Sequence, residues 1–137
     1  MKRTPLYENH LEHGAKMTDF SGFQMPVQFS RIQDEHMAVR QKAGIFDVSH
    51  MGEIILEGKG ALALLEKITT NKTSDLSIGQ AQYTLMTNPH GGIIDDLIIY
   101  RLAEEKYLLV VNAGNIQKDW NWIIEDKSYH SIARNVS

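Results

Sequence analysis

The sequence contains no cysteine in its 137 residues. Without a thiol there is no disulfide bond, no thiolate metal site and no cysteine nucleophile. Histidine offers no substitute, because no two of the six histidines stand four residues apart beside a glutamate, as a helical zinc site requires. We therefore expect a protein without a metal centre.

An excess of basic residues and long apolar runs are also missing. The net charge is −3 and the pI about 6.0, so no basic surface indicates nucleic acid or an acidic membrane as a partner. No apolar run is long enough to span a bilayer, and no signal-peptide-like segment follows Met1. We expect a soluble, cytoplasmic protein that binds neither nucleic acid nor membrane.

The size and composition of the chain are those of one globular domain, which we place at residues 1–137. The patterns predict two helices, a strand, a helix, three strands, a helix and a last strand. Residues 17–29 combine glycine, proline and aromatic residues and are expected to be irregular and partly extended. Hairpins and segregated helices favour an α+β fold, with antiparallel sheets and helices packed on one side, over a parallel α/β sheet.

The second predicted helix follows Ser30, which can form a capping box with Gln33. Ile32, His36 and Val39 recur at helical spacing along it. We expect this face, including His36, to be buried.

Two adjacent aspartates, Asp95 and Asp96, lie in an apolar strand pattern that follows the turn signal of residues 88–92. Successive side chains of a strand point to opposite faces, so the two carboxylates cannot face the same way. Aspartate is unfavourable in strands and costly to bury unpaired. One aspartate is expected to face solvent and the other to need a partner, such as a bound ligand. The alternative is a frayed strand start, or an aspartate that caps a backbone N–H.

The hairpin formed by this strand and the next defines a candidate surface. If Asp96 faces one side, Ile98 and Tyr100 share that side, and an odd-length turn adds Val110 and Asn112. A mostly apolar surface with a few convergent polar groups is typical of a small-molecule site. On it, Asp96 and Asn112 can pair with the amide and amine edges of a flat heterocycle.

Residues 58–63, Gly-Lys-Gly-Ala-Leu-Ala, fit the loose dinucleotide-binding pattern G-x-G-x-x-A at a strand-to-helix junction. The acidic residue expected after a second parallel strand is missing, because residues 69–79 have the pattern of a polar loop. We interpret residues 58–63 as a strand-to-helix turn, with phosphate contact as the alternative.

Seven short stretches form a set whose order and spacing are far more specific than any member: residues 4–7 (TPLY), 14–17 (GAKM), 25–29 (MPVQF), 35–40 (EHMAVR), 46–52 (FDVSHMG), 91–97 (GGIIDDL) and 110–113 (VVNA). Through this set, nearly the whole chain resembles the N-terminal region of the glycine cleavage system T protein, the aminomethyltransferase family. The resemblance implies the truncated folate-binding part of the aminomethyltransferase fold.

The resemblance also implies a reaction. Tetrahydrofolate would be the acceptor, and the lipoyl-bearing H protein the partner that delivers an aminomethyl group. A folate nitrogen takes the methylene, ammonia leaves, and 5,10-methylenetetrahydrofolate forms. The family's key carboxylate is the second aspartate of the pair, here Asp96, which would hydrogen-bond the pterin, position the reacting nitrogen and assist proton transfer. The family's folate contacts map onto Met51, Tyr83, Asp96, Ile98, Tyr100, Val110 and Asn112.

The sequence departs from the family in two ways. Phe23 stands where the family usually has tryptophan, and family members are much longer, with later domains that complete the folate pocket. We therefore expect a fragment that is inactive alone and that a separate C-terminal polypeptide can complete. Two alternatives stay open: a non-catalytic folate-binding module, and a structural fragment that binds nothing measurable.

Overall fold

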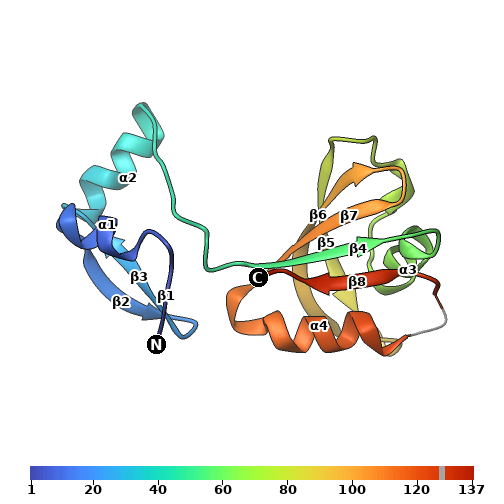
Figure 1. Cartoon of the computed structure of the whole chain (residues 1–137). Coiled ribbons are helices and arrows are strands. Elements are labelled where there is room, and N and C mark those ends of the chain that lie inside the picture. The colour runs from blue at the N-terminus through green and yellow to red at the C-terminus, as the bar shows by residue number, and fades with distance from the viewer. Residues whose placement is uncertain (127–128) are drawn as a thin grey trace. The chain divides into compact units, whose positions relative to one another are not determined.

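The computed structural model describes residues 1–126 and 129–137 of the chain (Figure 1). Two compact units make up the chain, unit 1 (Met1–His50) and unit 2 (Met51–Ser137). The length of the chain predicts a single domain and gives no sign of this subdivision. No helix among the described residues is long and apolar enough to cross a membrane.

Unit 1 is built around a three-stranded sheet with the order β1-β3-β2, in which β1 is parallel and β2 antiparallel to β3. The expectation of irregular, partly extended backbone at residues 17–29 is therefore confirmed for the extension and wrong for the irregularity. A tight turn at Ser21 and Gly22, with φ of 52° and 82°, joins β2 and β3, and Asp19 Oδ1 accepts a hydrogen bond from the Gly22 N–H. The elements of unit 1 are β1 (Lys2–Arg3), α1 (Tyr7–Glu12), β2 (Lys16–Phe20), β3 (Phe23–Gln28) and α2 (Ile32–Gln41).

The predicted second helix is present as α2, but its burial and its cap differ from the expectation. No residue of α2 is buried; Ile32 is 55% exposed and Val39 45%, and His36 is exposed rather than in the core. Arg31 is the N-cap residue and makes no side-chain cap bond; instead the Glu35 carboxylate accepts hydrogen bonds from the backbone N–H groups of Phe29 and Ser30, which precede the helix, and from the Ser30 hydroxyl. These backbone hydrogen bonds lower the pKa of Glu35.

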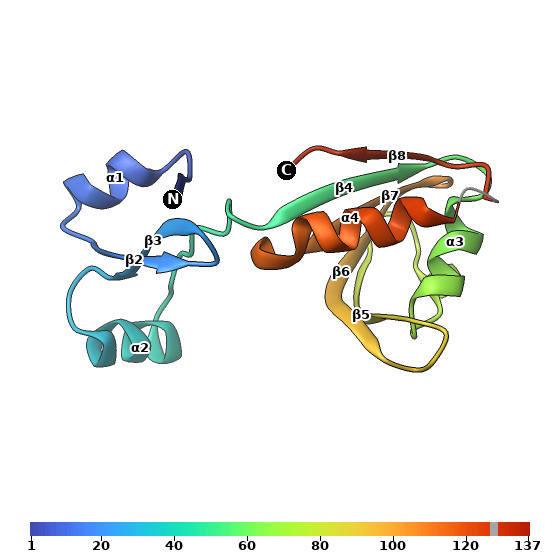
Figure 2. The same ribbon diagram turned by 90° about the horizontal axis from the view of Figure 1, so that it is seen from below.

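Unit 2 holds a five-stranded sheet with the order β5-β6-β7-β4-β8, in which every neighbouring pair is antiparallel (Figures 1 and 2). The predicted order of strand, helix, three strands, helix and strand is confirmed here. Its elements are β4 (Gly52–Glu57), α3 (Ala61–Ile68), a short 3-10 helix (Thr73–Asp75), β5 (Ala81–Thr87), β6 (Ile93–Ala103), β7 (Lys106–Val111), a second 3-10 helix (Ala113–Asn115), α4 (Ile116–Glu125) and β8 (Ile132–Asn135).

The core of unit 2 lies between one face of this sheet and the helices α3 and α4 (Figure 2). Alternate residues of β4, β6 and β7 are buried, as expected for strands with one covered face. The helices add Leu65 of α3 and Ile123 of α4, both almost fully buried. The α+β fold with helices packed on one side of an antiparallel sheet is therefore confirmed. We call the covered face of the sheet the inner face and the opposite face the outer face.

The glycine-rich segment between β4 and α3 is a strand-to-helix turn, as interpreted from the sequence. Gly58 adopts a φ of +112°, and Gly60 donates its N–H to the carbonyl oxygen of His130 at 3.1 Å. A Cβ atom at Gly60 would lie 2.7 Å from the backbone nitrogen of His130. Protein backbone therefore occupies the space beside Gly60, where a bound phosphate would have to lie.

Candidate functional site

A rigid turn of residues 88–92 leads into β6. The Asn88 side-chain oxygen accepts hydrogen bonds from the N–H groups of His90 and Gly92, and Gly91 has a φ of +80°. Asparagine and glycine favour such a turn, because asparagine bonds nearby backbone groups and glycine tolerates positive φ. The turn fixes where β6 begins and therefore which residues face the core.

The two aspartates point to opposite faces of β6. Asp95 is only 7% exposed and shares the inner face with buried Leu97 and Ile99. Asp96 lies on the outer face with Ile98. The predicted strand parity is therefore confirmed, and the alternative of a frayed strand start is wrong, because both aspartates pair with β5 within the ladder.

Two side chains hold the Asp96 carboxylate on the outer face. The Tyr83 hydroxyl donates a hydrogen bond to Asp96 Oδ2 at 3.1 Å. The Asn112 side-chain amide donates to Asp96 Oδ1 at 2.9 Å and lies 3.1 Å from the Asp96 carbonyl oxygen. The bond to Asp96 raises the pKa of the Tyr83 phenol above its usual value. Both oxygens of Asp96 are thus oriented before any ligand arrives.

Most of the remaining predicted folate contacts lie on the same face of the sheet as this carboxylate. Ile98 pairs with Tyr83 of β5 on one side and with Val110 of β7 on the other. Tyr100 lies two residues further along the same face and is 37% exposed, while Tyr83 is 59% exposed. Met51 immediately precedes β4. The structure thus brings Tyr83, Asp96, Ile98, Tyr100, Val110 and Asn112 onto one open face, and Met51 lies at the start of the strand beside β7.

The inner aspartate finds its partners within the protein. Asp95 Oδ1 accepts a hydrogen bond from the Asn112 amide at 3.1 Å, and Asp119 of α4 approaches from the helix layer. Burial opposes the ionisation of Asp95, but hydrogen bonds from Asp119 and Asn112 outweigh it and lower its pKa. Burial raises the pKa of Asp119 to about 8, and the neighbouring Asp95 adds to the shift. At neutral pH Asp119 is therefore protonated and Asp95 ionised.

Our sequence analysis missed Asp119. The signal was present, because Ile116, Asp119, Trp120 and Ile123 recur at the spacing of one helical face. An acid within an apolar stripe needs a buried partner. The stripe alone does not reveal that this partner is Asp95, which lies 24 residues earlier in the chain.

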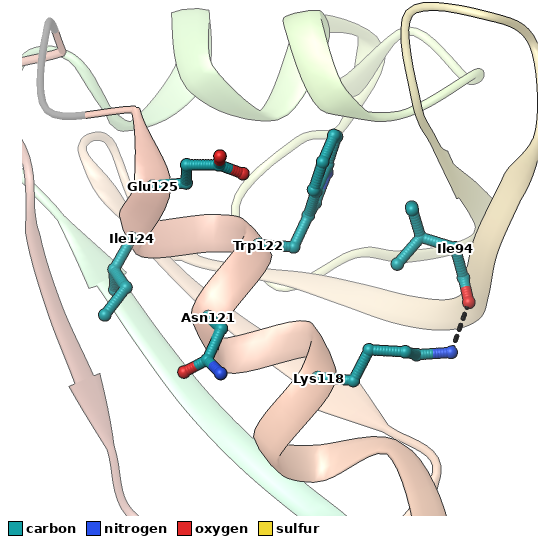
Figure 3. A pocket seen from close by; sticks show the side chains of 6 residues that line it. All are labelled: Ile94, Lys118, Asn121, Trp122, Ile124 and Glu125. Carbon is teal, nitrogen blue, oxygen red and sulfur yellow. Dashed lines mark hydrogen bonds between the residues drawn. The ribbon is translucent and has the colours of Figure 1, made fainter.

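A shallow pocket of about 570 Å³ lies between α4 and the start of β6 (Figure 3). Lys118 crosses it and donates a hydrogen bond to the Ile94 carbonyl oxygen at 2.6 Å. The indole nitrogen of Trp122 is buried, and no residue in the described part of the chain accepts its hydrogen. This pocket contains none of the predicted site residues; its lining is Ile94, Lys118, Asn121, Trp122, Ile124 and Glu125.

Unit 1 contains a separate polar cluster around Asp47. Its carboxylate accepts hydrogen bonds from the Thr4 hydroxyl and from the backbone N–H and hydroxyl of Ser49, and its Oδ2 lies 2.7 Å from His10 Nε2. Burial opposes the ionisation of Asp47, but the hydrogen bonds from Ser49, His10 and Thr4 hold its pKa well below the usual range. The hydroxyl of Ser49 donates to Asp47 and is therefore not available to pair with His50 as a nucleophile.

The matching family model and the curated relatives both indicate the aminomethyltransferase family. The family model described as GCVT N-terminal domain matches residues 6–137. An aminomethyltransferase of Lysinibacillus sphaericus (strain C3-41) is 52% identical over 132 residues, which are 96% of this chain and 36% of that protein. An aminomethyltransferase of Halothermothrix orenii (strain H 168 / OCM 544 / DSM 9562) is 53% identical over 137 residues, 100% of this chain and 38% of that protein.

A solved structure gives the same result for the fold. The glycine cleavage system aminomethyltransferase T from Bartonella henselae matches with a TM-score of 0.93 and 38% sequence identity, over 98% of this chain and 38% of that one. This chain therefore spans little more than a third of the length of the relatives it matches.

Proposed function

Since this chain belongs to the GCVT N-terminal domain family, we propose that it is the folate-binding part of an aminomethyltransferase of the glycine cleavage system. Its substrates would be tetrahydrofolate and the aminomethyl group that the H protein carries on its lipoyl arm. The methylene passes to folate and ammonia is released. The cytoplasmic location expected from the sequence belongs to the same proposal.

The observation that supports this function is the anchored carboxylate on the open face of the sheet. Asp96 is fixed at both oxygens by Tyr83 and Asn112, so it needs no reorientation when a ligand binds. Its neighbours Ile98 and Val110 are half-buried and apolar, which suits the flat ring of a pterin. A carboxylate beside such a ring accepts hydrogen bonds from ring and amine N–H groups.

In the proposed reaction Asp96 has a positioning role and a proton-transfer role. Holding the folate so that its nitrogen faces the incoming carbon removes much of the entropic cost of the reaction. The same carboxylate can accept a proton from folate as the new carbon–nitrogen bond forms. Tyr100 and Met51 would complete the contact with the ring on this face.

Calorimetry with tetrahydrofolate tests the binding part of the proposal. We expect the chain to bind it and the nearly isosteric Asp96→Asn variant to bind at least about tenfold more weakly, because an amide cannot replace both acceptor oxygens. Asp75→Asn is the matched control, since Asp75 is an exposed carboxylate of unit 2 that pairs with Lys72. Equal affinity of Asp96→Asn and the native chain would contradict the proposal.

Turnover is a separate question, because the chain covers only 36% and 38% of the two curated relatives. We propose that transfer from the aminomethylated H protein requires the C-terminal part that those relatives possess. The assay compares this chain alone with the chain plus the separately expressed C-terminal part of the Halothermothrix orenii relative. A rate for the chain alone near that of the full-length relative would refute this requirement.

The same short coverage favours a second candidate, a folate-binding module without transfer activity. It predicts tetrahydrofolate binding that depends on Asp96 but no transfer even after the C-terminal part is added. The two assays together therefore separate a transferase portion from a binding module.

A further inference from the structure

Asp119 lies fully inside unit 2, yet it is an acid. Its exposed fraction is 0%, and it belongs to the apolar stripe of α4 that faces the core. Neither of its carboxyl oxygens, nor Asp95 Oδ2, has a hydrogen-bond partner among the described residues when both groups are written as carboxylates. Two buried carboxylates with three unpaired oxygens would be strongly destabilising.

A single proton resolves this arrangement. If Asp119 carries it, its O–H donates to Asp95, and one buried negative charge remains instead of two. The charged groups that act on Asp119 are Asp95 and Asp96 of β6, which disfavour its ionisation, and Lys118 of α4, which favours it. No group of three acidic, histidine or cysteine side chains within the described residues is arranged to hold a metal ion, so a cation does not explain the pair.

Asn112 connects this buried pair to the outer face. Its side-chain nitrogen lies 3.1 Å from Asp95 Oδ1 and 2.9 Å from Asp96 Oδ1, so one amide contacts carboxylates on both faces of β6. Asp95 Oδ1 is thus one of the acceptors that orient this amide, beside the carbonyl and carboxylate oxygens of Asp96. Asp119 holds Asp95 from its other side, and the Asn115 side chain and the Asp96 backbone add weaker hydrogen bonds.

We propose that Asp119 is a positioning residue for the folate site: as a protonated acid it holds Asp95, which orients the Asn112 amide, which in turn orients the Asp96 carboxylate. This inference rests on the proposed function, because it assigns Asp119 to the site at which Asp96 would meet tetrahydrofolate. Asp119 does not touch the outer face, so its hydrogen-bonding effect on a ligand passes through Asp95 and Asn112, while its charge, when ionised, also acts on Asp96.

Two substitutions separate a hydrogen-bond role from a packing role. Asp119→Asn keeps a donor toward Asp95 but cannot lose a proton, whereas Asp119→Leu keeps the volume and removes the donor. Glu125→Gln is the control, because Glu125 is an exposed acid of the same helix. We expect Asp119→Leu to weaken tetrahydrofolate binding about tenfold or more and Asp119→Asn to stay within about threefold of the native chain.

The pH profile is the readout that a purely structural role would not change. The Asn112 side-chain amide signals, followed by nuclear magnetic resonance without any ligand, are expected to shift with a midpoint near the pKa of Asp119, about 8. In Asp119→Asn this transition should disappear, and in Glu125→Gln it should persist.

The outcomes are distinct. An Asn112 signal that does not titrate in the native chain, or that titrates equally in Asp119→Asn, overturns the proposal. The proposal is also overturned if Asp119→Leu binds tetrahydrofolate as tightly as the native chain does. The same holds if Asp119→Asn loses as much affinity for tetrahydrofolate as Asp119→Leu loses. If the native chain binds no tetrahydrofolate, the proposed function fails, while the ligand-free titration of Asn112 still decides whether Asp119 positions it.

Discussion

Units 1 and 2 are stabilised in different ways. Unit 2 has a continuous apolar cluster that includes Ile54, Leu65 and Ile99, all with 0% exposure. In unit 1, all of whose residues the structure describes, Met25 is the one buried apolar side chain, and Thr4 and His10 are buried beside it. Unit 1 therefore depends on polar contacts to a degree that unit 2 does not, since little of its apolar surface is removed from water.

The two units also handle a buried acid in opposite ways. Asp47 of unit 1 is surrounded by donors, from Thr4, His10 and Ser49, and is held ionised. Asp119 of unit 2 faces another carboxyl group and is held protonated. Burial opposes the ionisation of both acids, and the donors around Asp47 overcome it, whereas the neighbouring Asp95 adds to it at Asp119.

The largest expected effect concerns the cores. Ile99→Ala in unit 2 should lower the free energy of unfolding by about 2–5 kcal/mol, because it leaves a cavity in a closely packed cluster. Met25→Ala in unit 1 should lower the free energy of unfolding by a smaller amount, because the surroundings of Met25 are partly open. Urea denaturation of each variant measures both values. Equal decreases in the free energy of unfolding for the two variants would show that the two cores do not differ in packing.

The next effect concerns Asp47. Asp47→Ala should destabilise unit 1 by about 2–3 kcal/mol, because the donors of Thr4, His10 and Ser49 lose a charged acceptor. Hydrogen exchange of the backbone amides in β3 and α1 reports this loss locally. Unchanged protection of these amides, with Asp34→Asn as the exposed control, would show that the cluster does not hold unit 1 together.

A third prediction contrasts the two acids by pH. Since the folded-state pKa of Asp47 is lowered, its contribution to stability is present above about pH 4 and is lost as the pH falls. Since that of Asp119 is raised to about 8, its contribution is present below about pH 4 and is lost as the pH rises toward 8.

Asp119→Asn should therefore gain stability relative to the native chain between these pH values, by up to about 1.4 kcal/mol per pH unit. Denaturant titrations at several pH values measure the slope. A difference between the variant and the native chain that does not change with pH would mean that Asp119 is ionised in the folded protein.

The smallest predicted effect is on Tyr83. Its phenol should titrate above the usual range because it donates to Asp96, and Asp96→Asn should return it toward that range. Ultraviolet absorption of the phenolate follows this titration, and Tyr83→Phe identifies the signal. An unchanged Tyr83 titration in Asp96→Asn would show that the hydrogen bond across the outer face does not form in solution.

Alternation along β6 and β7 was enough to predict the outer face. Asp96 and Ile98 lie two residues apart on one strand, so they share a face. The short hairpin between β6 and β7 sets the register that places Val110 opposite Ile98. Whether these residues bind folate remains a prediction, because neither alternation nor register specifies a ligand.

Two features could not be derived from local pattern. The sequence indicated only partly extended backbone for β2 and β3, because Gly22 and Pro26 lower strand propensity; Gly22 lies in the turn between the two strands and Pro26 within β3. The apolar residues of α2 recur at helical spacing, which suggested that they are buried. Burial also requires a second element that packs against them, and the spacing within α2 does not reveal whether one is present. The pairing of Asp95 with Asp119 is likewise a tertiary contact.

The close approach of backbone at Gly60 has a consequence for association. The strand β8 covers the edge of β4, and the chain reaches it by passing within 2.7 Å of where a side chain at Gly60 would begin. A methyl group there would push this segment outward and uncover the hydrogen-bonding groups of β4. An uncovered strand edge invites pairing with other chains. Glycine at position 60 therefore leaves the space that the segment leading into β8 needs to reach the edge of β4.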